Sequence, residues 1–184
     1  MRNYQAETVR DIVPAPALGE HVEPQRGDGP VPVVDDVAAM LMRLALEHRR
    51  ILNGGSCCIV LCAADDVPEV SPDRVLTEAA DRFAAVLRGH DAIFRYGEDK
   101  LLLCLPHIKS SDGSRLMARL RRLVCDRPVS LPEGGRASIS VTLGGAMMNL
   151  IDMVEETAAC AERSLKSGRG AGGNCVCMWA PEVG

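Results

Sequence analysis

The chain has 184 residues, 47% of them hydrophobic, and a formal net charge of −4 at neutral pH. This length and hydrophobic content are sufficient for one folded domain with a core, and the mild acidity argues against general binding of nucleic acids or anionic membranes, because such surfaces require clustered Lys and Arg. No segment approaches the roughly 18 consecutive apolar residues of a membrane-spanning helix, and the N-terminal residues lack the apolar run of a signal peptide. We therefore expect a cytoplasmic protein without membrane insertion.

The first part of the chain differs in composition from the rest. Residues 1–34 are rich in proline and charge and show almost no hydrophobic periodicity. Such a segment cannot bury enough apolar surface to offset the entropy that is lost on ordering. We predict a flexible, proline-rich N-terminal tail over residues 1–34 and one globular domain over residues 35–180.

Helices and strands alternate in the first half of the predicted domain. Asp35 or Asp36 can cap a helix that runs to a double glycine, and residues 57–63 form a short apolar run that is typical of a strand buried on both faces. Ser71 is a suitable N-cap for the next helix, which we expect to include Arg88 in its last turn.

A hairpin follows, in which Gly97 supplies the positive φ angle that a tight turn needs. Its strands are residues 92–95 and 101–105, and the later elements are a helix over residues 112–124, a strand over 137–145, a helix over 150–167 and a strand over 174–179. This alternation of strands and helices predicts an α/β domain with a single sheet.

The eight cysteines lie mostly in the apolar, strand-like segments. They form no CxxC pair and no spacing that is typical of a zinc site. We interpret them as small, buried hydrophobic residues in a reducing cytosol, and not as disulfides or metal ligands.

Three strings of the sequence match the motifs of one family in order and spacing. Residues 94–101 (FRYGEDKL) resemble the aromatic-Arg-Gly-Gly-Asp/Glu-Glu-Phe turn of the GGDEF family, residues 139–146 (ISVTLGGA) are similar to its VTVSIGVA strand, and residues 161–176 align with its closing pattern. Over residues 37–179 the chain thus resembles a degenerate GGDEF, or diguanylate cyclase-like, domain. The resemblance implies an α/β fold with a single five-stranded sheet, mixed and largely antiparallel, flanked by helices as in the ferredoxin-like palm of nucleotide cyclases.

Active members of the family are expected to condense two GTP molecules into cyclic di-GMP, with metal ions held by carboxylates and each active site forming half of a dimer. At the matching positions, Asp99 corresponds to the metal-binding acid of the turn and Asp73 to a guanine-contacting Asp. Glu98 replaces the second Gly of the turn, and Lys100 replaces the acidic residue that follows. Where the family carries a metal-binding carboxylate at the end of its first strand, residues 62–64 read CAA.

The active-site positions of the family are therefore present only in part. The resemblance implies a vestigial active site of Asp73, Gly97, Glu98, Asp99, Lys100 and Arg169, the last of which replaces a phosphate-contacting Lys. With most of the metal-binding carboxylates replaced, electrostatic stabilisation of the triphosphate would be lost. We expect no catalytic residue, no required cofactor and no metal site. Mg²⁺ would bind only together with residual GTP, and Asp99 is then the candidate ligand.

A second ligand site of the family matches better. Arg88 and Asp91 form an RxxD pair at the spacing of the family's inhibitory, product-binding site. An Arg fork can bond the O6/N7 edge of guanine or a phosphate, and a carboxylate can accept from guanine N1–H and N2–H. Arg119 matches an Arg that the family often adds and that can stack on guanine, with Arg115 and Arg122 as less favoured alternatives. An Arg and an Asp three residues apart are also a common surface ion pair, so the prediction depends on the family context.

The leading hypothesis is a catalytically inactive GGDEF-like domain that serves as a cyclic di-GMP receptor through Arg88, Asp91 and Arg119 and relays occupancy to an unidentified protein partner. Two alternatives stay open. One is a nucleotide-independent interaction scaffold that uses the fold and the proline-rich tail, and the other is residual GTP binding or diguanylate cyclase activity through Asp73 and Asp99. A homodimer is compatible with each, and no nucleic-acid partner is expected.

Overall fold

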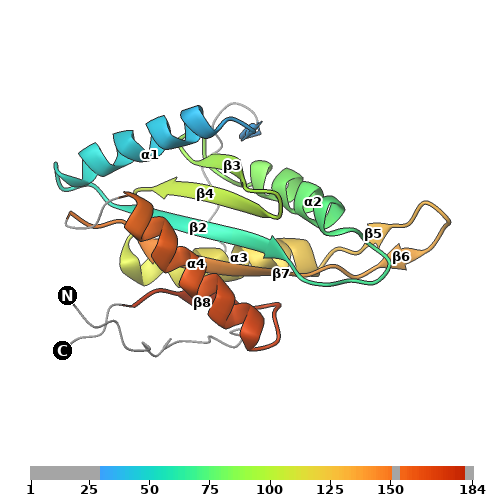
Figure 1. Ribbon diagram of the computed structural model, residues 1–184. Coiled ribbons are helices and arrows are strands. Elements are labelled where there is room, and N and C mark those ends of the chain that lie inside the picture. The colour runs from blue at the N-terminus through green and yellow to red at the C-terminus, as the bar shows by residue number, and fades with distance from the viewer. Residues whose placement is uncertain (1–29, 151–153, 181–184) are drawn as a thin grey trace.

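One mixed sheet carries helices on both of its faces (Figure 1). The structure is a computed structural model that describes residues 30–150 and 154–180. The helices are α1 (Val37–Ile51), α2 (Pro72–Ala84), α3 (Ser110–Cys125) and α4 (Val154–Gly170). The strands are β1 (Val33–Val34), β2 (Cys57–Ala64), β3 (Ala92–Tyr96), β4 (Lys100–Pro106), β5 (Val129–Ser130), β6 (Arg136–Ala137), β7 (Val141–Met147) and β8 (Val176–Met178). Within the described ranges no helix combines the length and the hydropathy that crossing a lipid bilayer requires.

Strand β2 lies at the centre of the six-stranded sheet, whose order is β1-β3-β4-β2-β7-β8. It pairs antiparallel with β4 on one side and with β7 on the other, so that Ile59 lies opposite both Cys104 and Ala146. The outer strands β1 and β8 are parallel to their neighbours β3 and β7. All eight residues of β2 are buried, which explains why its sequence is uniformly apolar instead of alternating.

Alternate side chains of β2 point into two separate cores. Val60 and Cys62 pack in the core that α2 and α3 cover, whereas Ile59 and Leu61 pack in the core that α1 and α4 cover. Figure 1 shows the same arrangement, with α1 and α4 on the near face of the sheet and α3 behind it. The central strand therefore fixes the positions of all four of these helices.

Local sequence signals determine where α1 and α2 begin. Asp36, and not Asp35, caps α1 by accepting hydrogen bonds of 2.8 and 3.1 Å from two backbone N–H groups of the first turn. Ser71 caps α2, and Pro72 follows as its first residue. Both helix starts confirm the predictions made from the sequence.

The main sheet has one strand more than the five that the sequence predicted, and β5 and β6 form a second, two-stranded sheet where the sequence predicted a single sheet. Strand β1 lies in the segment assigned to the tail and pairs with β3, while the buried Val31 donates its N–H to the carbonyl oxygen of Ala84 at 3.1 Å. A two-residue strand among prolines has no periodicity to detect. The folded domain thus begins before residue 35, and the predicted tail over residues 1–29 lies outside the described residues. The α/β class with a mixed sheet flanked by helices is confirmed.

Helix α4 lies closer to β7 than a side chain would allow. A Cβ atom on Gly144 would be 2.2 Å from the backbone N of Leu165 and 2.5 Å from the carbonyl oxygen of Ala161. Because both are backbone atoms, no change of rotamer can make room. Gly144 therefore sets the distance between α4 and the sheet.

We expect Gly144→Ala to lower the free energy of unfolding by about 3 kcal/mol, since α4 must move away from β7 to accommodate a methyl group. Gly144 lies in β7, and Gly170→Ala, in α4, is the control, because a Cβ atom on Gly170 meets nothing within 4 Å. The control should leave stability unchanged or raise it by up to about 1 kcal/mol. Urea denaturation measures both variants, and a Gly144→Ala midpoint equal to that of the wild type would contradict the close packing.

Candidate functional site

The β3–β4 hairpin has two ends, and the candidate residues lie at both. The RxxD turn, residues 88–91, precedes β3, and the Gly97 turn, residues 97–99, joins β3 to β4. Gly97 has a φ angle of 64°, which confirms the predicted tight turn. The two turns therefore lie at opposite edges of the sheet.

At the Gly97 turn, Lys100 neutralises the acid that precedes it. Lys100 Nζ lies 3.2 Å from Asp99 Oδ1 and 3.6 Å from Glu162 Oε1 of α4. Partial burial alone would lower the pKa of Lys100, but the hydrogen bond with Asp99 and the charge of Glu162 raise it above its usual value. Asp99, the candidate metal ligand, is thus paired with a cation of the protein itself, and the turn is tied to α4.

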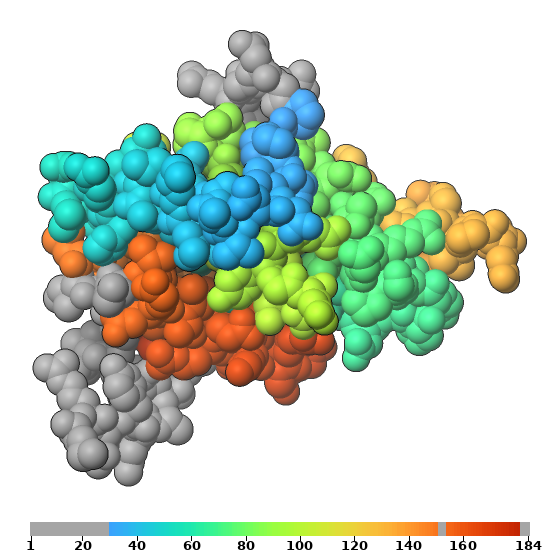
Figure 2. Space-filling view, turned by 45° about the horizontal axis from the view of Figure 1, so that its top comes forward, coloured from blue at the N-terminus to red at the C-terminus, as the bar shows by residue number. Residues whose placement is uncertain are grey.

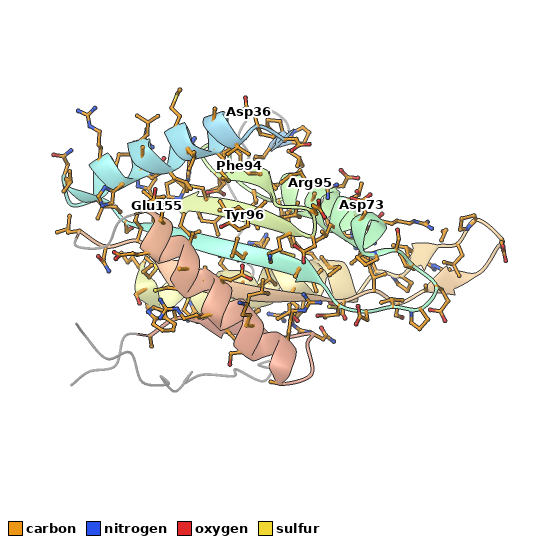
Figure 3. All side chains as sticks on the ribbon, viewed as in Figure 1. Asp36, Asp73, Phe94, Arg95, Tyr96 and Glu155 are labelled. Atoms are coloured by element: carbon orange, nitrogen blue, oxygen red, sulfur yellow. The ribbon has the colours of Figure 1, made fainter. Side chains whose placement is uncertain are left out.

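Asp73, in the first turn of α2, is exposed and paired with the hairpin. Its Oδ1 atom lies 3.2 Å from Arg95 Nη1, and Arg95 Nη2 donates to Thr77 Oγ1 at 3.0 Å. Figure 3 shows Asp73 and Arg95 together where α2 begins beside β3. Arg95 therefore links the helix to the hairpin at the surface, where such a pair adds little to stability.

Asp65, directly after β2, holds three segments together. Its carboxylate accepts hydrogen bonds from the hydroxyl groups of Ser140 at 2.7 Å and Thr142 at 2.6 Å, and from the backbone N–H of Asn174 at 2.8 Å. A Cβ atom on Gly173 would lie 2.8 Å from Asp65 Oδ1, so the glycine leaves the space that this contact needs. Sequence reasoning missed this role, because the donors lie 75 to 109 residues away and no local signal marks them.

The structure brings the residues that the resemblance assigned to a vestigial active site to one edge of the sheet. β2 ends there, and β4 begins there with Lys100 opposite Ala63. The exposed Arg169 lies in the last turn of α4, which packs beside β7. Within the described ranges, no group of three His, Cys, Asp or Glu side chains is arranged to hold a metal ion.

The RxxD turn is hydrogen bonded within itself. Asp91 N–H donates to the carbonyl oxygen of Arg88, and Arg88 N–H donates to Asp91 Oδ2, both at 2.8 Å. The prediction that Arg88 lies on the last turn of a helix is wrong, because α2 ends at Ala84. Val86 and Leu87 still pack against the core, which extends the helical spacing of apolar residues beyond the helix. The pair is joined through the backbone of Arg88, and its guanidinium is left exposed.

Asp91 is almost fully buried, with 7% of its surface exposed. Burial raises the pKa of Asp91 above its usual value, although the N–H of Arg88 and the side chains of His90, Arg88 and Arg43 lower it. Oδ1, the oxygen that is not bonded to Arg88, lies 3.9 Å from His90 Nε2. The carboxylate therefore has a structural role in the turn, apart from any contact with a ligand.

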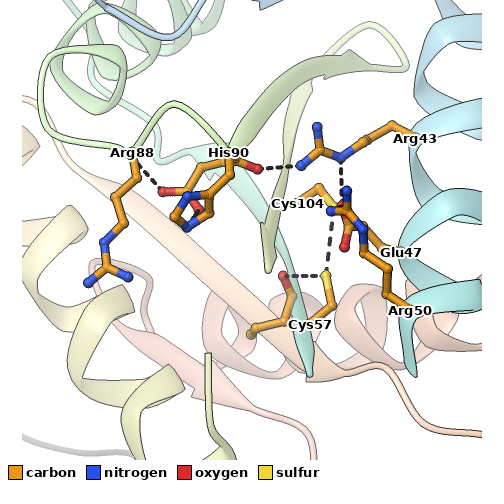
Figure 4. A network of polar contacts seen from close by, with 9 residues as sticks. Arg43, Glu47, Arg50, Cys57, Arg88, His90 and Cys104 are labelled. Carbon is orange, nitrogen blue, oxygen red and sulfur yellow. Dashed lines mark hydrogen bonds and ion pairs between the residues drawn. The ribbon is translucent and has the colours of Figure 1, made fainter. Parts of the chain in front are cut away.

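Helix α1 braces the RxxD turn (Figure 4). Arg43 Nη2 donates to the carbonyl oxygen of His90, and Arg43 Nε lies 2.9 Å from Glu47 Oε1. Arg50 Nη1 is bonded to the same oxygen at 2.8 Å, so two guanidinium groups neutralise a carboxylate that is 1% exposed. Sequence reasoning missed this brace, although a signal was present. Glu47 falls at helical spacing among the buried residues of α1, where a charge needs partners.

Of the predicted arginines, Arg88 and Arg119 are both exposed. Neither side chain forms a hydrogen bond or ion pair with another residue in the described ranges. The less favoured alternatives are engaged locally, Arg115 with Asp112 at 3.9 Å and Arg122 with a backbone carbonyl of its own helix at 3.5 Å. Arg119 lies on α3, which packs against α2, the helix that precedes the RxxD turn. That Arg88 and Arg119 form one ligand site with Asp91 stays a prediction.

The sequence model of the family described as diguanylate cyclase, GGDEF domain, matches residues 69–175. The matched segment runs from just before α2 to just before β8 and so contains both ends of the hairpin. It makes up more than half of the chain. The chain belongs to the GGDEF family. The matched segment of this GGDEF domain includes the Gly97 turn, whose sequence resembles the motif for which the family is named.

Relatives of the GGDEF domain match over the same length. "Uncharacterized protein YhcK" of Bacillus subtilis is 28% identical over 107 residues, which are 58% of this chain and 30% of YhcK. Diguanylate cyclase DosC of Escherichia coli is 26% identical over 107 residues, which are 58% of this chain and 23% of DosC. The matched region thus spans less than a third of these relatives.

Solved GGDEF structures share the fold. The GGDEF domain of DgcB from Caulobacter crescentus, in complex with c-di-GMP, has a TM-score of 0.73 at 16% identity and covers 90% of this chain and 100% of that chain. Diguanylate cyclase SiaD from Pseudomonas aeruginosa, in complex with its activator SiaC, has a TM-score of 0.71 at 24% identity and covers 80% of this chain and 58% of that chain. At these identities the likeness shows the fold alone.

Asp91→Asn should separate the structural role of this side chain from its charge. The amide keeps an oxygen for the Arg88 N–H, so the variant should fold, whereas Asp91→Ala should lose about 1 kcal/mol with the hydrogen bond. Because the folded-state pKa of Asp91 is raised, the protonated carboxyl group is favoured in the folded protein, and its protonation stabilises the fold. This stabilisation is complete below the ordinary pKa of 3.8 and is lost as the pH rises through the folded-state pKa.

Over this rise in pH, the free energy of unfolding of the wild type should therefore fall relative to that of Asp91→Asn. Urea denaturation at a series of pH values measures the difference. A difference that is constant with pH, or that changes in the opposite sense, would contradict the burial of the carboxylate.

Proposed function

We propose that this GGDEF domain is a catalytically inactive receptor that binds cyclic di-GMP at the RxxD turn and relays occupancy to a protein partner. The observation that carries the proposal is the contrast between the two ends of one hairpin. At the Gly97 turn, Asp99 is neutralised by Lys100. At the RxxD turn, the guanidinium of Arg88 is exposed and has no partner in the described part of the chain.

The loss of catalysis is argued from the metal-binding positions. In the segment that replaces the family's carboxylates, Cys62 is fully buried, and burial together with the nearby charge of Asp65 raises the pKa of its thiol. Mg²⁺ prefers oxygen ligands, so a buried neutral thiol does not replace a carboxylate. Asp65, the acid that directly follows β2, already accepts three hydrogen bonds from the protein. We therefore expect no required cofactor, and Mg²⁺ only with residual GTP binding.

In the proposed complex the three residues of the site have different tasks. Arg88 and Arg119, both exposed, contact the anionic phosphates and the guanine edge, for which a guanidinium fork is suited. Asp91 keeps the turn closed through Oδ2, and Oδ1 is the atom that can accept from guanine. The brace from Arg43 to His90 holds the turn in place before a ligand arrives.

Two of the solved structures support the partners in this proposal. The DgcB domain, of the same fold, is in complex with c-di-GMP, and SiaD is in complex with a protein activator. By analogy with DgcB, we place c-di-GMP at the RxxD turn of this chain. By analogy with SiaD, we expect a protein partner on another surface.

Titration of the domain with cyclic di-GMP by calorimetry tests the proposal. Arg88→Ala and Arg119→Ala should each weaken binding by about 2 kcal/mol, or roughly 30-fold, because each removes a charge-assisted contact. Arg127→Ala is the matched control, since Arg127 is also exposed but lies in the loop after α3, and it should bind as the wild type does. The receptor function would be contradicted if the wild type did not bind cyclic di-GMP at high micromolar concentrations, or if Arg88→Ala bound it with the affinity of the wild type.

Incubation with GTP and either Mg²⁺ or Mn²⁺ tests the enzymatic alternative. We expect no cyclic di-GMP among the products, because Asp99 is paired with Lys100 and Cys62 stands in the segment of the missing carboxylate. Chromatography of the reaction mixture detects the product, with an active diguanylate cyclase as positive control. Product formation that depends on Asp99 would replace the receptor function with an enzymatic one.

A nucleotide-independent scaffold is the second candidate function, favoured by the exposed apolar side chains of α1. Comparing partner capture by the full chain and by a chain without residues 1–29 separates binding by the N-terminal segment from binding by the domain. The deletion must stop before Val31, because Val31 and β1 belong to the fold.

A further inference from the structure

Helix α1 presents apolar side chains to solvent as well as to the core. Seven large apolar side chains are exposed among the described residues, and five of them lie between Val37 and Leu52. We call one set of exposed positions, spaced by three and four residues, the outer face of α1: Ala38, Leu41, Met42, Ala45 and Leu46. Figure 2 shows α1, in blue to cyan, lying across the surface with no other described element over it.

The core does not account for this face. The inner side of α1, with Met40, Leu44 and Ile51, is the part that packs against the sheet. On the opposite side, Leu41, Met42 and Leu46 would be 49%, 67% and 50% exposed in a monomer. A helix that is apolar on both sides, with contiguous exposed side chains, is typical of an interaction surface.

The two ends of the outer face carry opposite charges. Asp35 precedes the helix and Arg49 lies in its last turn. Both are exposed, and neither side chain is paired with another residue that the structure describes. Arg50, in contrast, is paired with Glu47 at 2.8 Å. The free charges are thus about 20 Å apart along the helix, with the apolar side chains between them.

This charge pattern distinguishes between two ways of pairing α1 with a second copy of itself. In a parallel pair, Asp35 would face Asp35 and Arg49 would face Arg49. In an antiparallel pair, Asp35 of each copy faces Arg49 of the other. The small side chains of Ala38 and Ala45 allow two helices to approach closely.

We propose that the outer face of α1 is the interface of an antiparallel homodimer with two-fold symmetry. The axis passes near Met42 and Ala45, so the apolar side chains of the two copies meet at the centre and the Asp35–Arg49 pairs form at both ends. The proposal does not depend on cyclic di-GMP, since the RxxD turn contributes nothing to the outer face. The inner side of the same helix does contact that turn, through Arg43 and His90.

Sedimentation velocity of the full 184-residue chain, without nucleotide and over a range of concentrations, measures the association. The wild type should show a monomer–dimer equilibrium. Met42→Glu, which places a charge at the centre of the interface on both copies, should weaken the dimer by at least about tenfold. Leu150→Glu is the matched control, because Leu150 is also apolar and 56% exposed but lies outside α1, and its dimer should persist.

Charge reversal tests the orientation. Asp35→Arg and Arg49→Asp should each weaken the dimer, because each places like charges together at both ends, and the double variant should restore it. Asp35 is suitable because the helix cap is Asp36, which stays intact. Circular dichroism of each variant verifies that the fold is retained.

A wild-type chain that stays monomeric up to its solubility limit would overturn the proposal, and the outer face would then belong to a different protein or to another segment. A Leu150→Glu variant that dissociates as readily as Met42→Glu would overturn it as well. Failure of the double charge reversal to restore the dimer would exclude the antiparallel arrangement.

Discussion

The antiparallel pairing of β2 with both β4 and β7 is the constraint on which the other features depend. Because successive side chains of β2 enter different cores, the strand fixes α2 and α3 on one face and α1 and α4 on the other. Strand β4 in turn carries β3, so the two turns of the hairpin fall at opposite edges of the sheet. A shift of one residue in this register would exchange the two cores and move Lys100 from its place beside α4.

The two edges differ in how far their charges are satisfied within the protein. Near the Gly97 turn, Lys100 lies between Asp99 and Glu162, and Asp73 is paired with Arg95. A ligand at that edge would have to compete with internal partners for each of these groups. At the other edge the buried charge of Glu47 is fully matched, while the exposed Arg88 is not. An anion approaching the RxxD turn therefore meets a cation that is not already neutralised.

The features that the sequence predicted correctly are local. Asp36, Ser71 and Gly97 are recognisable because the backbone groups that they serve lie within a few residues of each. The buried strand β2 and the alternation of elements were equally predictable from hydrophobic runs and turn residues. These signals, taken together, were enough for the fold class.

The features that the sequence did not predict are contacts between distant residues, the choice of hydrogen-bonding groups within a turn, and the end of one helix. The brace between Arg43 and His90 spans 47 residues, and one hydrogen bond of Asp65 spans 109. The spacing of Arg88 and Asp91 was correct in the sequence, but spacing does not determine which groups bond, and the carboxylate bonds the backbone N–H. The end of α2 was misplaced because apolar side chains continue toward the core after the helix has ended.

The position of β1 has a mechanical consequence. This two-residue strand is the outermost strand of the sheet and pairs with β3. It leads directly into α1, whose inner side contacts the RxxD turn. Tension on the chain ahead of Pro30 acts first on the buried Val31 and its hydrogen bond to Ala84 and then on the short β1–β3 pair, and it reaches α1 only after these contacts have broken. Val31 and β1 therefore bear a pulling force that arrives along the preceding chain before α1 does.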